Sequence, residues 1–178
     1  MDSASRDLQK RIEDLIRYSG MMRDATLRPT GEHALADVLA GVLARQRLAL
    51  DARGFQVETQ LNAPTVHCDR SQLETVLDNL LSNAIKFSPE GGRILVKSEP
   101  LDDAVALWVC DQGEGIPEAE RSRVFEPFFQ GARQPPSTVK GSGLGLSIVR
   151  ESMLAAGGGV EVVDCPPWST CFRLTWPV

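Results

Sequence analysis

Four short blocks, rich in glycine, asparagine and phenylalanine, constrain this chain more than any other feature. They read NLLSNAIKFS at residues 79–88, DQGEGIP at 111–117, FEPFF at 125–129 and GSGLGLSIV at 141–149. Each block alone is weak evidence, because glycine-rich segments and asparagine pairs also occur in ordinary turns and helix caps. All four together, in one order and across a domain-sized stretch, indicate one specific binding site.

The length and charge of the chain limit what it can be. With 178 residues, of which 42% are hydrophobic, it is long enough for one well-buried core and short for two. Its net charge of −5 gives no general attraction to nucleic acid or to an anionic membrane. No apolar stretch approaches the roughly 20 residues that span a bilayer, and the start lacks a signal-peptide pattern. We expect a cytoplasmic fragment without nucleic-acid or membrane contacts of its own.

The four cysteines form no recognisable motif. Cys68, Cys110, Cys165 and Cys171 show neither a CxxC spacing nor companion histidines, which argues against a zinc site. Cys165 and Cys171 could face each other across a hairpin. In a reducing compartment we expect free thiols.

The N-terminal segment has the pattern of a separate helix. Between residues 6 and 23, apolar residues recur at helical spacing with charged residues between them. A proline and then a glycine after residue 27 predict a linker or a short strand. We therefore place a domain boundary there, with residues 1–26 as a helix end and linker and residues 27–178 as one domain.

Hydrophobic periodicity predicts alternating helices and strands in that domain. Helices are expected at about 33–52, from Asp69 or Ser71 to a point before Pro89, and at 144–154. Strands are expected at 55–61, 94–97 and 105–110, with a closing hairpin at 160–163 and 170–175. His33 would open the first helix, and His67 would end a strand. The polar stretch 130–142, rich in glycine and proline, predicts a loop over a pocket.

The asparagine pair lies on the second predicted helix. Because Asn79 and Asn83 are four residues apart, they project from the same face, and Lys86 and Phe87 continue that edge one turn later. Carboxamide oxygens can bind a hard cation without adding full negative charge beside a triphosphate. An isolated pair more often caps or bonds a neighbouring loop, so a Mg-ATP interpretation depends on the other blocks.

Asp111 ends a predicted buried strand, and two glycines follow it. Gly113 and Gly115 remove side chains where a flat ring would approach the backbone, and the carboxylate can accept from an exocyclic amine. The same pattern suits a tight turn closed by the aspartate side chain. The residues alone leave both interpretations open.

The glycines of the last block precede a helix. Bare backbone amides at Gly141, Gly143 and Gly145, together with a helix N-terminus, can meet phosphate oxygens. The block is not a Walker P-loop, because the lysine followed by serine or threonine is missing. It is not a dinucleotide fingerprint either, because a polar loop precedes it instead of a strand.

Taken together, the four blocks resemble the N, G1, F and G2 boxes of the ATP-binding catalytic domain of sensor histidine kinases. That domain belongs to the superfamily shared with gyrase and the large heat-shock chaperone ATPases. The resemblance implies an α/β two-layer sandwich, the Bergerat fold, in which helices cover one face of a mixed, mostly antiparallel sheet. It implies ATP and Mg²⁺ as cofactors, with the nucleotide held between the helices and a lid.

The resemblance also assigns roles residue by residue. Asn83 is the magnesium ligand, Asn79 supports the metal and the phosphate waters, and Lys86 approaches the phosphates; these three form the catalytic set. Asp111 binds the adenine amino group and Phe87 packs beside the base. The other nucleotide contacts that it implies are Gly113, Gly115, Ile116, Arg133, Lys140, Gly141, Gly143, Leu144, Gly145, Leu146 and Thr170.

The phenylalanine block reads as a packing element. Aromatic residues at the close spacing of Phe125, Phe128 and Phe129 usually bury against a core or hold a loop. The resemblance agrees, because this block anchors the lid and meets the histidine-bearing partner domain. Thr170 matches a hydroxyl that often reaches adenine through water, although the Pro166-Pro167-Trp168 turn before it departs from the family pattern.

A histidine kinase passes the γ-phosphoryl group of ATP to a histidine on a helical dimerisation module. Neither His33 nor His67 has the sequence surroundings of such an acceptor, so the resemblance implies an acceptor outside this chain. The implied partners are the dimerisation module of a parent kinase and a downstream response regulator, and an inner-membrane anchor for that parent stays open. Because Asn79 stands where hydrolytic relatives have glutamate, we expect slow ATP hydrolysis.

Two other functions stay open. One is a serine protein kinase of the anti-sigma-factor type, which shares this superfamily. The other is a non-catalytic module that uses nucleotide only to order its lid. The FEPFF block and the long closing hairpin favour the histidine kinase branch, and the retained Asn83, Asp111 and glycine triplet argue against a non-catalytic module.

Overall fold

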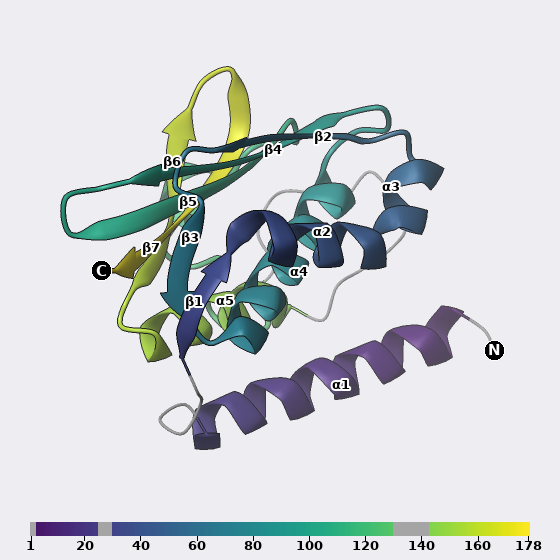
Figure 1. The fold of residues 1–178 in the computed structure, drawn as a ribbon. Coiled ribbons are helices and arrows are strands. Elements are labelled where there is room, and N and C mark those ends of the chain that lie inside the picture. The colour runs from purple at the N-terminus through teal and green to yellow at the C-terminus, as the bar shows by residue number, and fades with distance from the viewer. Residues whose placement is uncertain (1–2, 25–29, 130–142) are drawn as a thin grey trace.

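The computed structural model describes residues 3–24, 30–129 and 143–178, which form one long helix beside a two-layer α/β domain (Figure 1). The long helix is α1 (Ser3–Asp24), and its neighbour in the domain is α5. The helical layer comprises α2 (Leu35–Arg45), α4 (Arg70–Phe87) and α5 (Gly145–Ala155). A short helix, α3 (Arg47–Ala52), follows α2, and a single 3-10 turn spans Glu118–Glu120.

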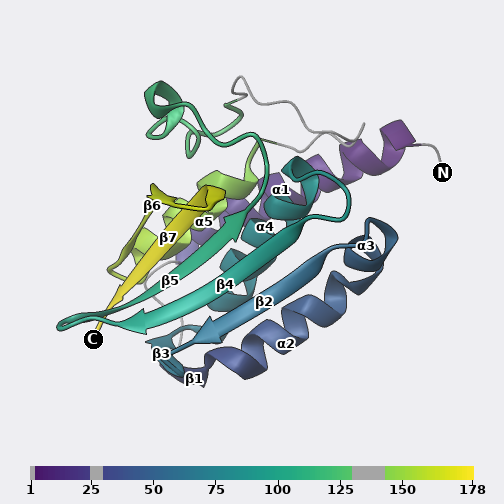
Figure 2. The same cartoon turned by 90° about the horizontal axis from the view of Figure 1, so that it is seen from above.

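The main sheet has five strands in the order β2-β4-β5-β7-β6 (Figure 2). Their bounds are β2 (Gln56–Leu61), β4 (Arg93–Pro100), β5 (Ala104–Asp111), β6 (Gly159–Cys165) and β7 (Trp168–Pro177). Among the described strands of this sheet, only β2 and β4 pair in parallel. Helices cover one face, so the expected two-layer sandwich with a mixed, mostly antiparallel sheet is confirmed. A separate two-stranded sheet pairs β1 (Gly31–Ala34) with β3 (Thr65–Cys68).

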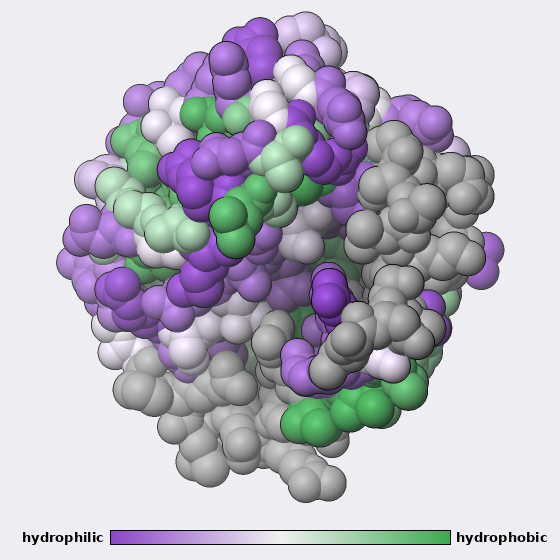
Figure 3. Space-filling model, turned by 90° about the vertical axis from the view of Figure 1, so that its right-hand side faces the viewer, coloured by the Kyte–Doolittle hydropathy of each residue, from purple (hydrophilic) through white to green (hydrophobic). Residues whose placement is uncertain are grey.

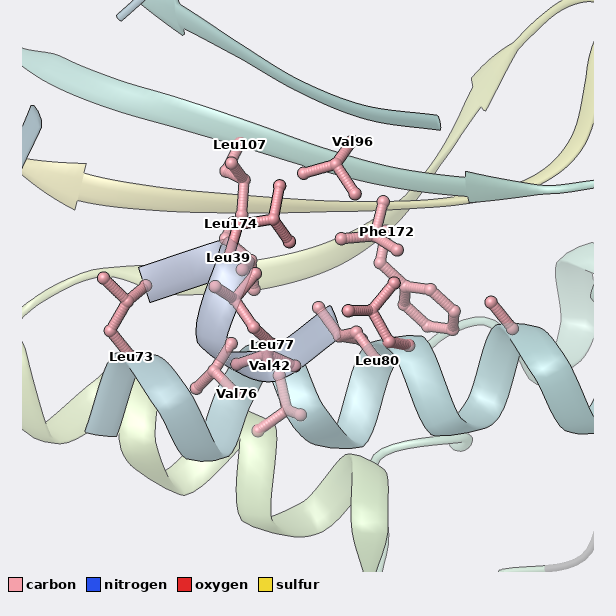
Figure 4. Packing of buried hydrophobic residues seen from close by; sticks show 14 of the residues in the cluster. Leu39, Val42, Leu73, Val76, Leu77, Leu80, Val96, Leu107, Phe172 and Leu174 are labelled. Atoms are coloured by element: carbon pink, nitrogen blue, oxygen red, sulfur yellow. The ribbon is translucent and has the colours of Figure 1, made fainter. Parts of the chain in front are cut away.

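The core lies between α4 and the inner face of the sheet (Figure 4). Helix α4 contributes an apolar stripe at helical spacing, and alternate residues of the strands face it. The labelled core residues are Leu39 and Val42 of α2, Leu73, Val76, Leu77 and Leu80 of α4, and Val96, Leu107, Phe172 and Leu174 of the sheet. The start of α4 is fixed by Asp69, whose carboxylate accepts from the Ser71 amide at 2.8 Å.

The helix predicted over residues 33–52 is wrong in two places. His33 lies in β1, where it is the register partner of Val66, instead of opening a helix. The helix also breaks at Gln46, whose backbone leaves helical geometry between α2 and α3. There the Gln46 side chain donates to Asp78 of α4 at 2.9 Å. Both departures depend on contacts with segments more than 30 residues away. The hydrophobic periodicity of the segment itself does not contain this information.

Apolar side chains of α1 stay at the surface. Leu8, Ile12, Leu15 and Ile16 are each at least 49% exposed. On the face in Figure 3, hydrophilic residues dominate and apolar residues gather in separate patches. Within the described part of the chain, no helix combines the length and the apolar character that crossing a membrane requires.

We expect Gly158→Ala to destabilise the domain strongly. A Cβ atom there would overlap the carbonyl oxygen of Thr175, a backbone atom that cannot move without disturbing β7. The free energy of unfolding should fall by about 3 kcal/mol, as for other overpacked sites. The matched control is Gly159→Ala, where a Cβ atom meets nothing within 4 Å. Equal midpoints for the two variants in urea denaturation would contradict the packing at this turn.

Candidate functional site

The C-terminal half of α4 carries the first group of predicted site residues. The Asn79 Nδ2 atom donates to the backbone oxygen of Thr75 at 2.8 Å, which fixes the side-chain amide on the helix. Its Oδ1 atom faces the start of α5, because a Cβ atom on Gly145 would lie 3.1 Å from it. A glycine at residue 145 therefore lets the two helices meet at this point. One turn beyond Asn83, the Lys86 Nζ atom lies 5.0 Å from the centre of the Phe87 ring.

Asn83 has a buried polar atom that the described protein does not satisfy. Its Nδ2 atom is inaccessible to solvent and has no hydrogen-bond partner. A buried amide left in this way destabilises the fold, and most such groups in proteins are paired. Rotating the side-chain amide by 180° exchanges its nitrogen and oxygen while the group keeps nearly the same shape. The oxygen of Asn83 can therefore occupy the position of Nδ2. The residue thus fits the donor type that Mg²⁺ takes.

Asp111 and Thr170 form the second group, at the ends of two neighbouring strands. They are register partners in β5 and β7, and each is 1% exposed. The Asp111 Oδ1 atom accepts from the Gly113 amide at 2.8 Å, so the tight-turn interpretation of this block is correct as local geometry. The Thr170 Oγ1 atom is buried without a hydrogen-bond partner in the described structure. A carboxylate and an unsatisfied hydroxyl therefore lie together on the inner face of the sheet.

The glycines after Asp111 permit two close approaches of the backbone. A Cβ atom on Gly113 would lie 2.8 Å from the carbonyl oxygen of Phe87, so this turn passes directly over the end of α4. Gly115 has φ +82°, a conformation that favours glycine, and a Cβ atom there would lie 3.0 Å from the Ser169 oxygen. Ile116, the next residue, is buried in the main core. These contacts bring the aspartate end of β5 next to the asparagine helix.

Two residues that sequence reasoning missed hold this arrangement in place. The Ser169 hydroxyl hydrogen-bonds to the carbonyl oxygens of Gly113 and Asp111, which ties β7 to the turn. The Arg53 guanidinium donates to the carbonyl oxygens of Ile85 and Ser88, and it thereby satisfies the C-terminal end of α4. The partners are 32 to 58 residues apart in sequence, so no local pattern pointed to them.

The phenylalanine block is only partly a packing element. Phe125 is buried, stands edge-on to Phe172 with 6.1 Å between ring centres, and its carbonyl oxygen accepts from the Ser147 hydroxyl of α5 at 2.9 Å. Phe128 is 61% exposed, so it does not bury against the core, the first of the two roles expected for this block. Its backbone is held instead, because its amide donates to the Gly143 oxygen at 2.8 Å.

The start of α5 lacks the side chains that usually cap or neutralise a helix N-terminus, as far as the described residues show. Among the described residues no side chain caps this helix, and no acidic residue lies in its first turn. The first amides of a helix lack partners within the helix and attract anions. Leu144 is buried against Ile148, and Leu146 packs on the main core, so both position the helix start. Arg133, Lys140 and Gly141 lie outside the described residues.

The predicted residues that the structure describes therefore gather at one end of the domain. They come from the last turns of α4, the turn after β5, the first turn of α5 and the start of β7. Between these elements lie the carboxylate of Asp111, the hydroxyl of Thr170, the amide of Asn83 and the uncapped end of α5. Such a donor set suits a flat base with an amino group at one side and phosphates with a cation at the other.

The family described as Histidine kinase-, DNA gyrase B-, and HSP90-like ATPase matches residues 68–178. Sensor histidine kinase GlrK of Escherichia coli K12 is 37% identical over 177 residues, which are 99% of this chain and 37% of that protein. The alginate biosynthesis sensor protein KinB of Pseudomonas aeruginosa is 34% identical over 171 residues, 94% of this chain and 28% of that protein. The chain thus spans about a third of the length of the curated relatives it matches.

Solved structures of histidine kinases also resemble this chain. Full-length ShkA in complex with AMPPNP aligns with a TM-score of 0.80 and 26% identity, covering 96% of this chain and 35% of that one. Mycobacterial sensor histidine kinase MprB aligns with a TM-score of 0.70 and 33% identity, covering 84% of this chain and 97% of that one.

Thr170→Val should stabilise the ligand-free domain. Valine has nearly the shape of threonine but brings no unsatisfied hydroxyl into the interior, so the free energy of unfolding should rise by about 1 kcal/mol. Chemical denaturation measures this directly. The control is Thr175→Val on the same strand, where the side chain is half-buried and the change should stay within about 0.5 kcal/mol. A destabilised Thr170→Val protein would mean that the hydroxyl has a structural partner.

Proposed function

Because the chain belongs to the family of histidine kinase-, DNA gyrase B- and HSP90-like ATPases, and its relatives over nearly its whole length include sensor histidine kinases, we propose a phosphotransfer function for it. In this proposal the domain binds Mg-ATP and passes the γ-phosphoryl group to a histidine on a dimerisation module. The observation that carries the proposal is the pair of buried, unsatisfied polar atoms, Asn83 Nδ2 and Thr170 Oγ1, beside the buried Asp111 carboxylate.

The base-binding end rests on Asp111 and its neighbours. The carboxylate accepts a hydrogen bond from the exocyclic amine of adenine, and a charge-assisted bond of this kind contributes about 1.5–3 kcal/mol. Guanine carries a carbonyl oxygen in the equivalent position, which the carboxylate repels. Gly113 and Gly115 let the ring come close to the backbone, Thr170 supplies a hydroxyl, and Phe87 packs beside the base.

The phosphate end rests on α4 and α5. Asn83 provides an amide oxygen to the metal, Asn79 supports the metal and phosphate waters, and Lys86 brings a positive charge to the same edge of the helix. The first turn of α5, entered through Gly143 and Gly145, offers backbone amides to phosphate oxygens. When bound, Mg²⁺ neutralises and orients the phosphates. Arg133, Lys140 and Gly141 are proposed to act at this end as the sequence predicts.

Transfer to another protein is favoured over hydrolysis. A hydrolytic site needs a general base beside the attacking water, and the amide of Asn79 cannot take up a proton as a carboxylate does. This amide is also engaged with the backbone of its own helix. The domain therefore acts mainly by positioning the phosphates for an external nucleophile.

The exposed apolar surface supports the proposed partners. Leu8, Ile12, Leu15 and Ile16 expose much of their surface on α1, which is consistent with residues 1–26 as the end of a dimerisation helix and its linker. Exposed Phe128 suits contact with the histidine-bearing module. We place residues 27–178 as the ATP-binding domain, acting in the cytoplasm within a parent kinase, with a response regulator downstream; an inner-membrane anchor for that parent stays open.

Nucleotide should stabilise the domain through Asp111. A hundredfold excess over the dissociation constant of Mg²⁺ with AMPPNP should add roughly 2.7 kcal/mol to the free energy of unfolding, measured as a rise in melting temperature. Asp111→Asn should lose most of this rise, whereas Asp102→Asn, in an exposed turn, should keep it. The guanine analogue should give a much smaller rise. An unchanged melting curve for the wild-type protein at saturation would refute the site assignment.

The transferred phosphoryl group should be found on histidine. Incubation with labelled ATP and a supplied dimerisation module should yield a phosphoprotein that is labile to acid and stable to base. Asn83→Ala should reduce the initial rate at least tenfold, because the metal ligand is lost. Asn62→Ala, whose amide bonds Glu99 at the surface, should leave the rate unchanged. An acid-stable product would instead identify a serine kinase.

A further inference from the structure

A cluster of three cysteine side chains lies on the outer face of the sheet, opposite the helices. Cys110, Cys165 and Cys171 come from β5, β6 and β7, which are neighbours in the sheet (Figure 2), and their sulfur atoms all lie within 4.8 Å of one another. We propose that these three cysteines form a three-thiolate site for a soft d10 metal cation, with Cu(I) as the best fit.

The sheet itself builds the cluster. Cys110 and Cys171 are direct register partners across β5 and β7, and side chains alternate along a strand, so both point away from the face that carries Asp111 and Thr170. Cys165 joins them from β6, where the pairing with β7 shifts by one residue between Val163 and Cys165. Such irregularities re-aim side chains near strand ends. The spacing of the cysteines in the sequence therefore hides their proximity.

The distances suit a metal without rearrangement of the strands. A metal–sulfur bond of about 2.3 Å holds the sulfurs of a three-thiolate site about 4 Å apart. Sulfur atoms that all lie within 4.8 Å of one another need to close by less than about an ångström, which side-chain rotation supplies. Cys110 and Cys171 are fully buried, and half-buried Cys165 opens the cluster to solvent. Its surroundings are apolar: Leu95, Trp108, Val163 and Trp168.

The electrostatic surroundings of the three thiols are mixed, because the pKa of Cys110 and of Cys165 is raised and only that of Cys171 is lowered. The Lys97 ammonium lies 4.9 Å from the centre of the Trp108 ring, and the Arg93 guanidinium lies 5.7 Å from that of Trp168. Burial raises the pKa of Cys165, and the Lys97 charge opposes that rise. The hydrogen bond between the two buried thiols raises the pKa of Cys110 and lowers that of Cys171, while the charges of Asp111 and Asp164 oppose the fall at Cys171. A bound cation replaces protons that these crowded sulfurs otherwise share.

The donor set selects the kind of cation. Within the described residues no histidine nitrogen or carboxylate oxygen joins the three sulfurs. Sulfur-only donors select soft metals, and a site with three of them suits trigonal Cu(I). Structural zinc sites take four protein ligands, so Zn²⁺ fits less well. The Asn83 region has the opposite character, because amide oxygens suit hard Mg²⁺.

The test is a competition for Cu(I) under a phosphine reductant and without nucleotide. The protein should withdraw one equivalent of Cu(I) from a chromogenic chelator, and X-ray absorption should report a sulfur-only shell. Cys165→Ser should lower the affinity at least a hundredfold. Cys68→Ala is the matched control, because Cys68 is buried in the main core and lies outside the cluster.

The outcomes distinguish Cu(I) binding by the three-cysteine cluster from nonspecific Cu(I) binding by any cysteine. Loss of binding in Cys165→Ser, with a cooperative melting curve and retention in Cys68→Ala, supports the site. Unchanged binding in Cys165→Ser, loss in Cys68→Ala, or no uptake of Cu(I) by the wild-type protein overturns it. Preference for Zn²⁺ over Cu(I) also overturns it, since the choice of a soft cation would then be wrong. Failure here leaves the nucleotide site unaffected, because no measurement in this series uses ATP.

Discussion

The burial of α4 is the constraint on which the rest of the structure depends. One side of this helix fills the space between α2 and the sheet, while its polar edge carries Asn79 and Asn83. Both ends are secured, by Asp69 at the start and by Arg53 at the last carbonyl groups. The site amides therefore cannot shift without disturbing the core. The buried position of α4 also brings its C-terminal end against the turn at Gly113. This contact sets the distance between Asp111 and the asparagines of α4.

Much of the fold follows from local patterns in the sequence. The apolar stripe of α4, the alternation in β2 and the glycines at strand ends each predict their element, because each is a short-range property. The break at Gln46 and strand β1 escape prediction, since both depend on partners far along the chain. The same reason explains why Ser169 and Arg53 were missed. The sequence left open whether Phe128 is buried or holds a loop, because an exposed phenylalanine held by its backbone has the same sequence pattern as a buried one.

Because side chains alternate along β5 and β7, the two strands present oxygen donors on one face of the sheet and sulfur donors on the other. Asp111 and Thr170 face the helices with oxygen atoms, and Cys110 and Cys171, their immediate neighbours in sequence, face outward with sulfur. Hard and soft ligands are thus kept apart without any additional element. Because the same backbone bonds hold both pairs, a change in the spacing of the two strands reaches both faces together.

The unsatisfied atoms of the site reveal a balance between stability and binding. A buried hydroxyl or amide without a partner weakens the ligand-free fold. Thr170 and Asn83 stand at strand and helix positions where valine or leucine would pack without that cost. A ligand that completes their hydrogen bonds would recover the stabilisation that the ligand-free fold lacks. The fold can bear the cost of these unsatisfied atoms, because the apolar contacts of the core around α4 hold the site residues in position before any ligand binds.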